Sequence, residues 1–266
     1  MMKKGRQKKY FRAIGKSMLR HLRAFFETKK PEELHRFRVQ VKKLNALLLL
    51  LPERSKEDDY AKHLKKLRST YKHAGEIRKA HINIGLLEQY PMDNPLFKHA
   101  LENKVKRETE QFCLKRNAGI KNVKWICKTM AVAFPAVKDS VVLNLFQRRL
   151  KKLVRLFEKS RESIEQLHNV RKEIKKLLYL NQMLPGSLAE KLHLNAEYLD
   201  QLQDTIGKWH DVESVTELLK REGLTKGSAI TTLHRQRRKL HRAVLVSSED
   251  FAKKVVSEDD QHFSRD

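Results

Sequence analysis

A basic segment occurs twice in this chain, first as Leu34-His35-Arg36-Phe37-Arg38-Val39-Gln40-Val41-Lys42-Lys43-Leu44 and then as Leu167-His168-Asn169-Val170-Arg171-Lys172-Glu173-Ile174-Lys175-Lys176-Leu177. The offset of 133 residues is half of the 266-residue chain. Aligned without gaps, residues 34–52 and 167–185 agree at nine of nineteen positions, including the Leu-Pro pair that ends each segment. Such a repeat predicts a duplicated unit. The shared residues are leucines and four basic side chains, so the repeat retains a charged site together with a packing surface.

The composition favours helices and an acidic partner. Lysine and arginine total 58 residues against 32 of aspartate and glutamate, which gives a formal net charge of +26. A charge of this size disfavours a compact monomer unless counterions or a polyanion screen it. Charged residues make up 34% of the chain, whereas there are only nine glycines and six prolines. This balance is typical of long amphipathic helices, so we expect an all-α protein.

Cysteine usage and hydropathy indicate a cytoplasmic protein. Cys113 and Cys127 form no CxxC pair and have no histidines at ligand spacing, so neither a zinc site nor a disulfide framework is indicated. The basic residues 1–12 are not followed by the apolar segment of a secretory signal. The longest apolar run, residues 46–51, is too short to cross a bilayer. We therefore expect a soluble protein of the cytoplasm.

Apolar spacing and chain breaks predict two four-helix bundles. Helices are expected over residues 8–26, 31–52, 57–89 and 94–115, which would make a first bundle of residues 1–119, followed by a connector over 120–136. A second bundle is expected over 137–246, with helices near 188–221 and 225–245, and a flexible tail over 247–266. On the first helix the expected buried residues are Phe11, Ile14, Met18, Leu22 and Phe25. After the connector, the helical spacing of apolar residues begins again with Val141, Leu145, Leu150, Leu153 and Phe157.

The basic residues of each repeat lie beside a seam of apolar residues. In the first copy the seam consists of Leu34, Phe37, Val41, Leu44, Leu48 and Leu51. At about 100° per residue, His35, Arg38 and Lys42 occupy an arc of roughly 60° next to this seam and span about 10 Å of helix axis, while Lys43 points further outward. The second copy places His168, Arg171, Lys175 and Lys176 in the same way. We call these eight residues the cationic motif.

The helix after each repeat also carries a matched glycine. Gly75, followed by Arg78, corresponds at an offset of 132 to Gly207, followed by His210. A glycine inside a helix costs roughly 1 kcal/mol relative to alanine, so two at equivalent places indicate a close approach, of which helix packing is the first explanation and a ligand the second. The last expected helix is crowded with further cations, from which we take Arg238 as an additional candidate.

The doubled His-x-x-Arg-x-x-x-Lys-Lys-Leu helix, followed by a Gly-x-x-Arg element, resembles the CHAD domain, the conserved histidine α-helical domain. The resemblance covers roughly residues 5–246. It implies two four-helix bundles related by pseudo-twofold symmetry, with a basic groove or pore between them that binds inorganic polyphosphate, and an association with polyphosphate granules. It also implies that the cationic motif and Arg78 contact the polymer. This chain has Arg78-Lys79 and His210-Asp211 where the family usually has Arg-Asp or Asn-Asp.

Other functions fit the pattern less well. Many CHAD proteins carry a triphosphate-tunnel enzyme domain with a Glu-x-Glu-x-Lys strand, which this sequence lacks, so we expect the standalone form and no enzyme activity. Arginine and lysine beside the paired histidines would repel a divalent cation, so we expect no metal and no cofactor. Non-specific binding of RNA or DNA through the same basic face is the alternative function. The aromatic residues, however, fall at core spacing and are not interleaved with the basic residues as in a stacking platform.

Overall fold

The computed structural model describes residues 4–51, 58–90, 94–130, 134, 136–160 and 164–256. Within these ranges the chain is helical apart from short turns and connections, and an isolated β-bridge pairs Leu194 with Val256. The expected all-α class is therefore confirmed. No helix in the same ranges is both long and apolar enough to pass through a membrane. The chain forms two compact units, Met1–Val137 and Lys138–Asp266.

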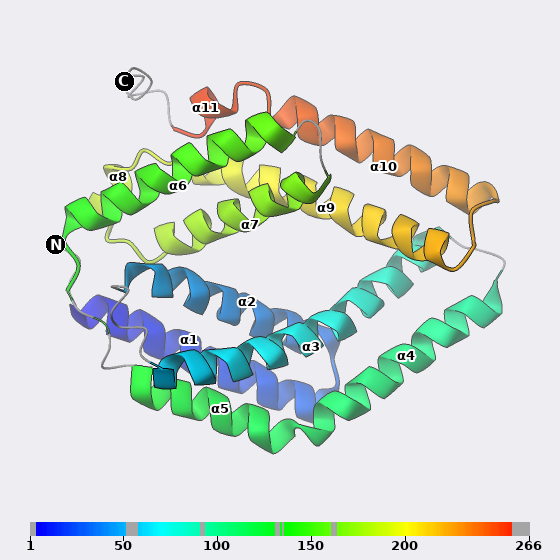
Figure 1. The fold of residues 1–266 in the computed structure, drawn as a ribbon, viewed down its shortest axis with the longest axis horizontal. Helices are drawn as coiled ribbons and strands as arrows, with labels where there is room; N and C mark the ends of the chain where they lie inside the picture. The colour runs from blue at the N-terminus through cyan, green and yellow to red at the C-terminus, as the bar shows by residue number, and fades with distance from the viewer. Residues whose placement is uncertain are drawn as a thin grey trace. The chain divides into compact units, whose positions relative to one another are not determined.

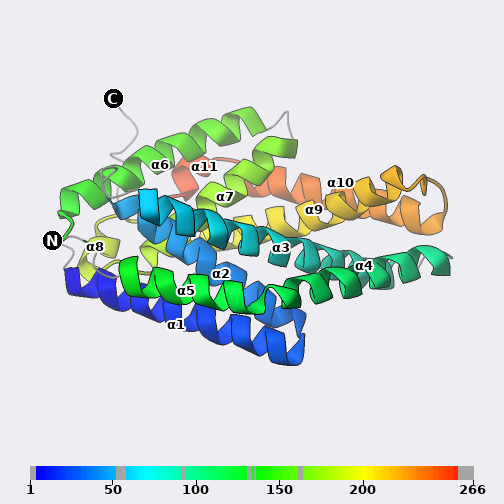
Figure 2. The ribbon, with the colours of Figure 1, turned by 60° about the horizontal axis from the view of Figure 1, so that its bottom comes forward.

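The first unit is built around four mutually packed helices (Figure 1). Helix α1 packs on α2 and α5, and α3 packs on α2 and α5, so the four close a bundle. Helix α4 packs mainly along α3, and both extend beyond the ends of α1, α2 and α5 (Figures 1 and 2). The elements are α1 (Lys4–Thr28), α2 (Pro31–Leu47), the 3-10 turn η1 (Leu48–Leu50), α3 (Asp58–Gln89), α4 (Pro95–Leu114) and α5 (Arg116–Thr129).

The core of the first unit follows the expected spacing. All five apolar residues expected on the buried face of α1, from Phe11 to Phe25, are at most 2% exposed. Leu34, Phe37, Val41 and Leu44 of α2 are buried against them, and each such side chain contributes about 1.5–3 kcal/mol. The α-helix ends at Leu47, earlier than expected, because the leucines that follow form the turn η1.

The fourth member of this bundle is α5 and not the helix over 94–115. Residues 120–136 were expected to form a connector, yet Arg116–Thr129 is a helix whose Val123 and Ile126 are fully buried. Gly119, expected in a break, lies inside α5, where a Cβ would sit 3.8 Å from Leu22 Cδ2. Five cations between residues 115 and 128 conceal this buried stripe in the sequence.

The second unit contains α6 (Asp139–Ser160), α7 (Ile164–Asn181), α8 (Gly186–Glu190), α9 (Ala196–Arg221), α10 (Ser228–Ser247) and α11 (Phe251–Lys254). Helix α6 packs on α7, α7 on α9, and α9 on α10. The long helix expected from residue 188 is divided, because α8 ends at Glu190 and Asn195 caps α9 by accepting a hydrogen bond from the Tyr198 N–H at 3.1 Å.

Two expectations for the second unit are wrong. Val141 is 48% exposed, whereas Val142 is fully buried, so the apolar stripe of α6 begins one residue later than expected. The segment after Ser247, expected as a flexible tail, packs on the unit through Phe251, whose ring centroid is 4.3 Å from that of Phe157. Residues 257–266 of that expected tail lie outside the described part of the chain.

Candidate functional site

In the first unit, Arg38 of α2 rests directly on the backbone of α3. Its Nη1 donates a hydrogen bond to the Tyr71 carbonyl oxygen, and its guanidinium carbon lies 4.0 Å from the centroid of the Tyr71 ring. A Cβ atom added at Gly75, one turn further along α3, would overlap Arg38 Nη1. The glycine therefore makes the space in which the guanidinium lies. The guanidinium has five N–H donors, so donors remain after the bond to Tyr71.

The second unit repeats this contact. Arg171 Nε donates to the Gln203 carbonyl oxygen at 3.1 Å, and a Cβ at Gly207 would lie 2.7 Å from Arg171 Nη2. Tyr71 and Gln203 both precede the matched glycine by four residues. The close approach expected at the two glycines is thus made by the arginine of the motif, from α2 in the first unit and from α7 in the second.

The other residues of the first motif copy lie along α2. His35 is exposed, and Lys42 and Lys43 are half-buried. Burial lowers the pKa of Lys43. Burial also lowers the pKa of Arg38, helped by the charge of Arg78 and opposed by Tyr71 and Glu76. Their positive charges are therefore partly removed from water. In these less polar surroundings they act over a longer range than fully hydrated charges do.

The second copy has closer electrostatic partners. The His168 ring stacks on the His210 ring with centroids 4.7 Å apart. Burial and the charge of Arg171 lower the pKa of Lys175 to about 8, although the carboxylates of α9 oppose this shift. Its pKa therefore lies well below the ordinary lysine value of 10.5.

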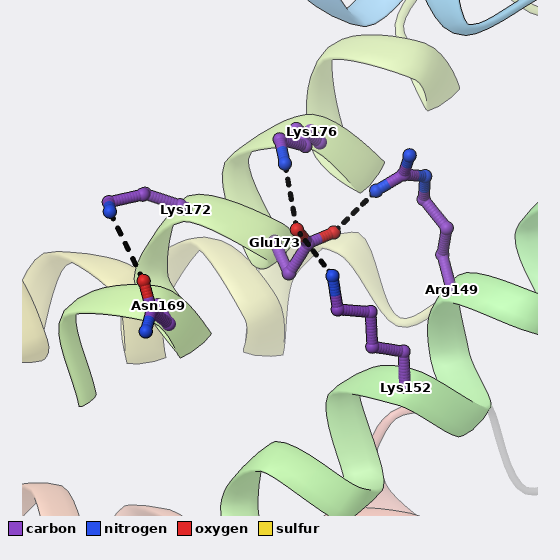
Figure 3. A network of polar contacts seen from close by, with 6 residues as sticks. All are labelled: Arg149, Lys152, Asn169, Lys172, Glu173 and Lys176. Carbon is purple, nitrogen blue, oxygen red and sulfur yellow. Dashed lines mark hydrogen bonds and ion pairs between the residues drawn. The ribbon is translucent and has the colours of Figure 1, made fainter. Parts of the chain in front are cut away.

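Lys176 belongs to an ion-pair network around the buried carboxylate of Glu173 (Figure 3). Its Nζ lies 2.7 Å from Glu173 Oε1, and Arg149 Nη1 of α6 lies 2.6 Å from Glu173 Oε2, with Lys152 Nζ 3.5 Å from Oε1. Burial would raise the pKa of Glu173, yet the hydrogen bond from Lys176 and the three positive charges lower it. This network holds α6 to α7, and Lys176 has a structural partner in addition to its proposed ligand.

The two candidates outside the motif differ in position. Arg78 lies on α3, one turn after Gly75, and its Nη1 is 3.4 Å from Glu32 Oε1. Arg238 is exposed on α10, which packs on α9. Its neighbour Arg237 turns inward and donates to the buried Glu213 at 3.2 Å. Arg78 is therefore adjacent to the motif through Arg38, whereas Arg238 lies on a helix that packs on α9.

Sequence reasoning missed the partners of the motif. Tyr71 and Gln203 bind the arginines through backbone carbonyl groups, which every residue type has, so residue type does not reveal them. Both lie four residues before a matched glycine, and this spacing could have identified them. Glu173 is visible as the acid three residues before Lys176, at helical pair spacing. No group of three or more His, Cys, Asp and Glu side chains is placed to hold a metal ion within the ranges that the structure covers.

Comparison with known proteins gives two consistent results. Residues 9–220 match the family model described as the CHAD domain. The crystal structure of the CHAD domain from the plant Ricinus communis is similar in fold, with a TM-score of 0.60 and 15% sequence identity over 93% of this chain and 89% of that chain. The search of curated proteins gives no significant match.

Proposed function

The chain belongs to the CHAD domain family, and we propose that it binds inorganic polyphosphate through the cationic motif on α2 and α7. CHAD domains are associated with polyphosphate binding in general. The observation that carries the proposal for these residues is the contact made twice, in which Arg38 and Arg171 are each fixed against a helix glycine. An arginine fixed in this way loses little further freedom when it binds phosphate.

The remaining motif residues extend this donor set along the helix. His35 and Lys42 in the first unit, and His168 and Lys175 in the second, precede and follow the fixed arginine on the same side of the helix. They span about 10 Å of axis, which suits a linear polymer of phosphates better than a single compact anion. Arginine can donate two parallel hydrogen bonds to phosphate oxygens, and lysine adds a point charge.

We further propose that the module binds without catalysis. The motif supplies hydrogen-bond donors and positive charges, which stabilise a bound polyanion. Phosphoryl transfer would in addition need carboxylates grouped to hold Mg²⁺ beside the phosphates, and among the described residues no group of three or more His, Cys, Asp and Glu side chains is placed to hold a metal ion. Incubation with long-chain polyphosphate and Mg²⁺ should therefore leave the chain-length distribution unchanged, and shortening of the polymer would refute this part of the proposal.

A charge reversal at the motif tests the proposed site. Lys42→Glu combined with Lys175→Glu should weaken polyphosphate binding, measured by calorimetric titration, by about tenfold or more. The matched control is Lys104→Glu with Lys226→Glu, which makes the same change in net charge at one exposed lysine in each unit. Circular dichroism checks that both proteins remain folded. Equal losses of affinity in the two variants would mean that net charge, and not the motif, determines binding.

A further inference from the structure

Helices α3 and α9 carry opposite charges at corresponding positions. On α3, Arg68, Lys72, Gly75 and Lys79 are spaced by four, three and four residues, which places them on one face. At the same spacing α9 carries Asp200, Asp204, Gly207 and Asp211. We call these two sets the α3 stripe and the α9 stripe. Apart from the glycine, the first consists of three cations and the second of three carboxylates.

Each stripe faces the motif of its own unit. Gly75 contacts Arg38 and Gly207 contacts Arg171, and each arginine binds the carbonyl four residues before its glycine. Since a helix places residues three and four apart on the same side, the charged members of each stripe lie on the side of the helix that carries its glycine. On that side α3 carries three cations, although the carboxylate of Glu76 also acts on Arg38, whereas α9 carries three carboxylates.

The carboxylates of the α9 stripe are held in place beside the motif. The Gln203 side-chain amide donates to Asp200 Oδ1 at 3.0 Å and to Asp204 Oδ1 at 2.7 Å, while the Gln203 carbonyl accepts from Arg171. The charges of Asp204, Asp200 and Asp211 act on Lys175 and favour its protonated form. Lys176 is in turn paired with Glu173, where α2 has the uncharged Gln40.

We propose that the two units are unequal polyanion sites, in which the first binds phosphate strongly and Asp200 and Asp204 weaken the second by competing for Arg171 and Lys175. This inference rests on the proposed function and specifies which unit sets the affinity. A phosphate that approaches α7 must displace these carboxylates or bear their repulsion, whereas one that approaches α2 meets the attraction of Arg68 and Lys72.

Two neutralising variants test the inequality. Asp200→Asn with Asp204→Asn should tighten polyphosphate binding roughly three- to tenfold at low salt, the scale of two exposed charge pairs. Arg68→Gln with Lys72→Gln should weaken it by a similar factor. Asparagine retains an acceptor oxygen for Gln203, and thermal unfolding checks that the fold survives. The titration is made at about pH 6.5, so that Lys175 remains protonated in every variant.

A charge-matched control separates a local effect from net charge. Glu217→Gln with Glu222→Gln removes two exposed carboxylates from the same unit, away from the α9 stripe. It should change affinity much less than the aspartate variant. In a Lys175→Met background the gain from Asp200→Asn and Asp204→Asn should shrink, because one of the competing cations is gone.

The titrations can contradict the inequality of the two units or the proposed function, and the two failures look different. If the wild-type protein binds polyphosphate and the aspartate variant behaves like the glutamate control, the units are not made unequal by Asp200 and Asp204. If the wild-type protein binds no polyphosphate in the same titration, the proposed function itself fails.

Discussion

Replacing Gly75 by alanine should expel Arg38 from its position on α3. The new Cβ would overlap Arg38 Nη1, and the side chain can move away because it is long and flexible. Alanine gains about 1 kcal/mol of helix propensity. The displaced guanidinium loses a hydrogen bond worth about 1.5–3 kcal/mol and a contact over the Tyr71 ring worth about 0.5–1 kcal/mol. The net expectation is a destabilisation of about 1–3 kcal/mol, or about 3–10 °C in melting temperature.

The same substitution should weaken polyphosphate binding about tenfold, since Arg38 would no longer be fixed for phosphate. Thermal unfolding followed by circular dichroism measures the first effect, and calorimetric titration measures the second. Gly85→Ala is the matched control on the same helix, because nothing lies within 4 Å of a Cβ at that position. It should raise stability by up to about 1 kcal/mol and leave affinity unchanged. If Gly75→Ala instead behaves like Gly85→Ala, the arginine-to-glycine contact does not exist in solution.

Three further predictions follow from the charged groups. Lys175→Met should raise the melting temperature, because a half-buried ammonium with a pKa of about 8 costs stability below that pH, and it should weaken polyphosphate binding by removing a positive charge. As the pH rises from about 8 to 10.5, the ordinary pKa of lysine, Lys175 loses its proton in the folded protein and this cost disappears. The difference in stability between the variant and the wild type should therefore narrow over this range. Glu173→Gln should destabilise the protein by about 1–3 kcal/mol near neutral pH. The loss should disappear in acid unfolding curves as the pH falls below the ordinary pKa of 4.5, since the folded-state pKa of Glu173 is lower still. Polyphosphate affinity should also rise from about pH 7 to about pH 5.5 if imidazole protonates on binding, and His35→Gln with His168→Gln should remove that rise.

The apolar pattern predicted the parts of the fold in which one face of a helix is uniformly buried. Phe11 to Phe25 on α1 and Leu34 to Leu44 on α2 lie where the spacing placed them. The prediction failed where cations or paired apolar residues obscured the buried face. In α5, lysines flank Val123 and Ile126, and in α6 Val141 and Val142 are adjacent, so spacing alone could not choose between them.

The sequence predicted which residues form the candidate site, but not which groups those residues contact. The repeat identified Arg38 and Arg171, and the matched glycines indicated that something approaches α3 and α9 closely. Only the three-dimensional arrangement shows that the arginines themselves make that approach. The pairing of Glu173 with Arg149 joins residues 24 positions apart, a contact that no local pattern specifies. Aligning α3 with α9 at Gly75 and Gly207 places Lys72 and Asp204 at the same position, which makes their opposite charges comparable.

Competition between polyanions at fixed ionic strength tests the central claim most directly. Labelled single-stranded RNA or duplex DNA is bound to the protein and then titrated with long-chain polyphosphate, and the reverse titration is made with labelled polyphosphate. Polyphosphate should displace nucleic acid at a far lower phosphate concentration than nucleic acid needs to displace polyphosphate. Displacement of polyphosphate by RNA at the lower phosphate concentration would contradict the account and assign the basic surfaces of α2 and α7 to nucleic acid.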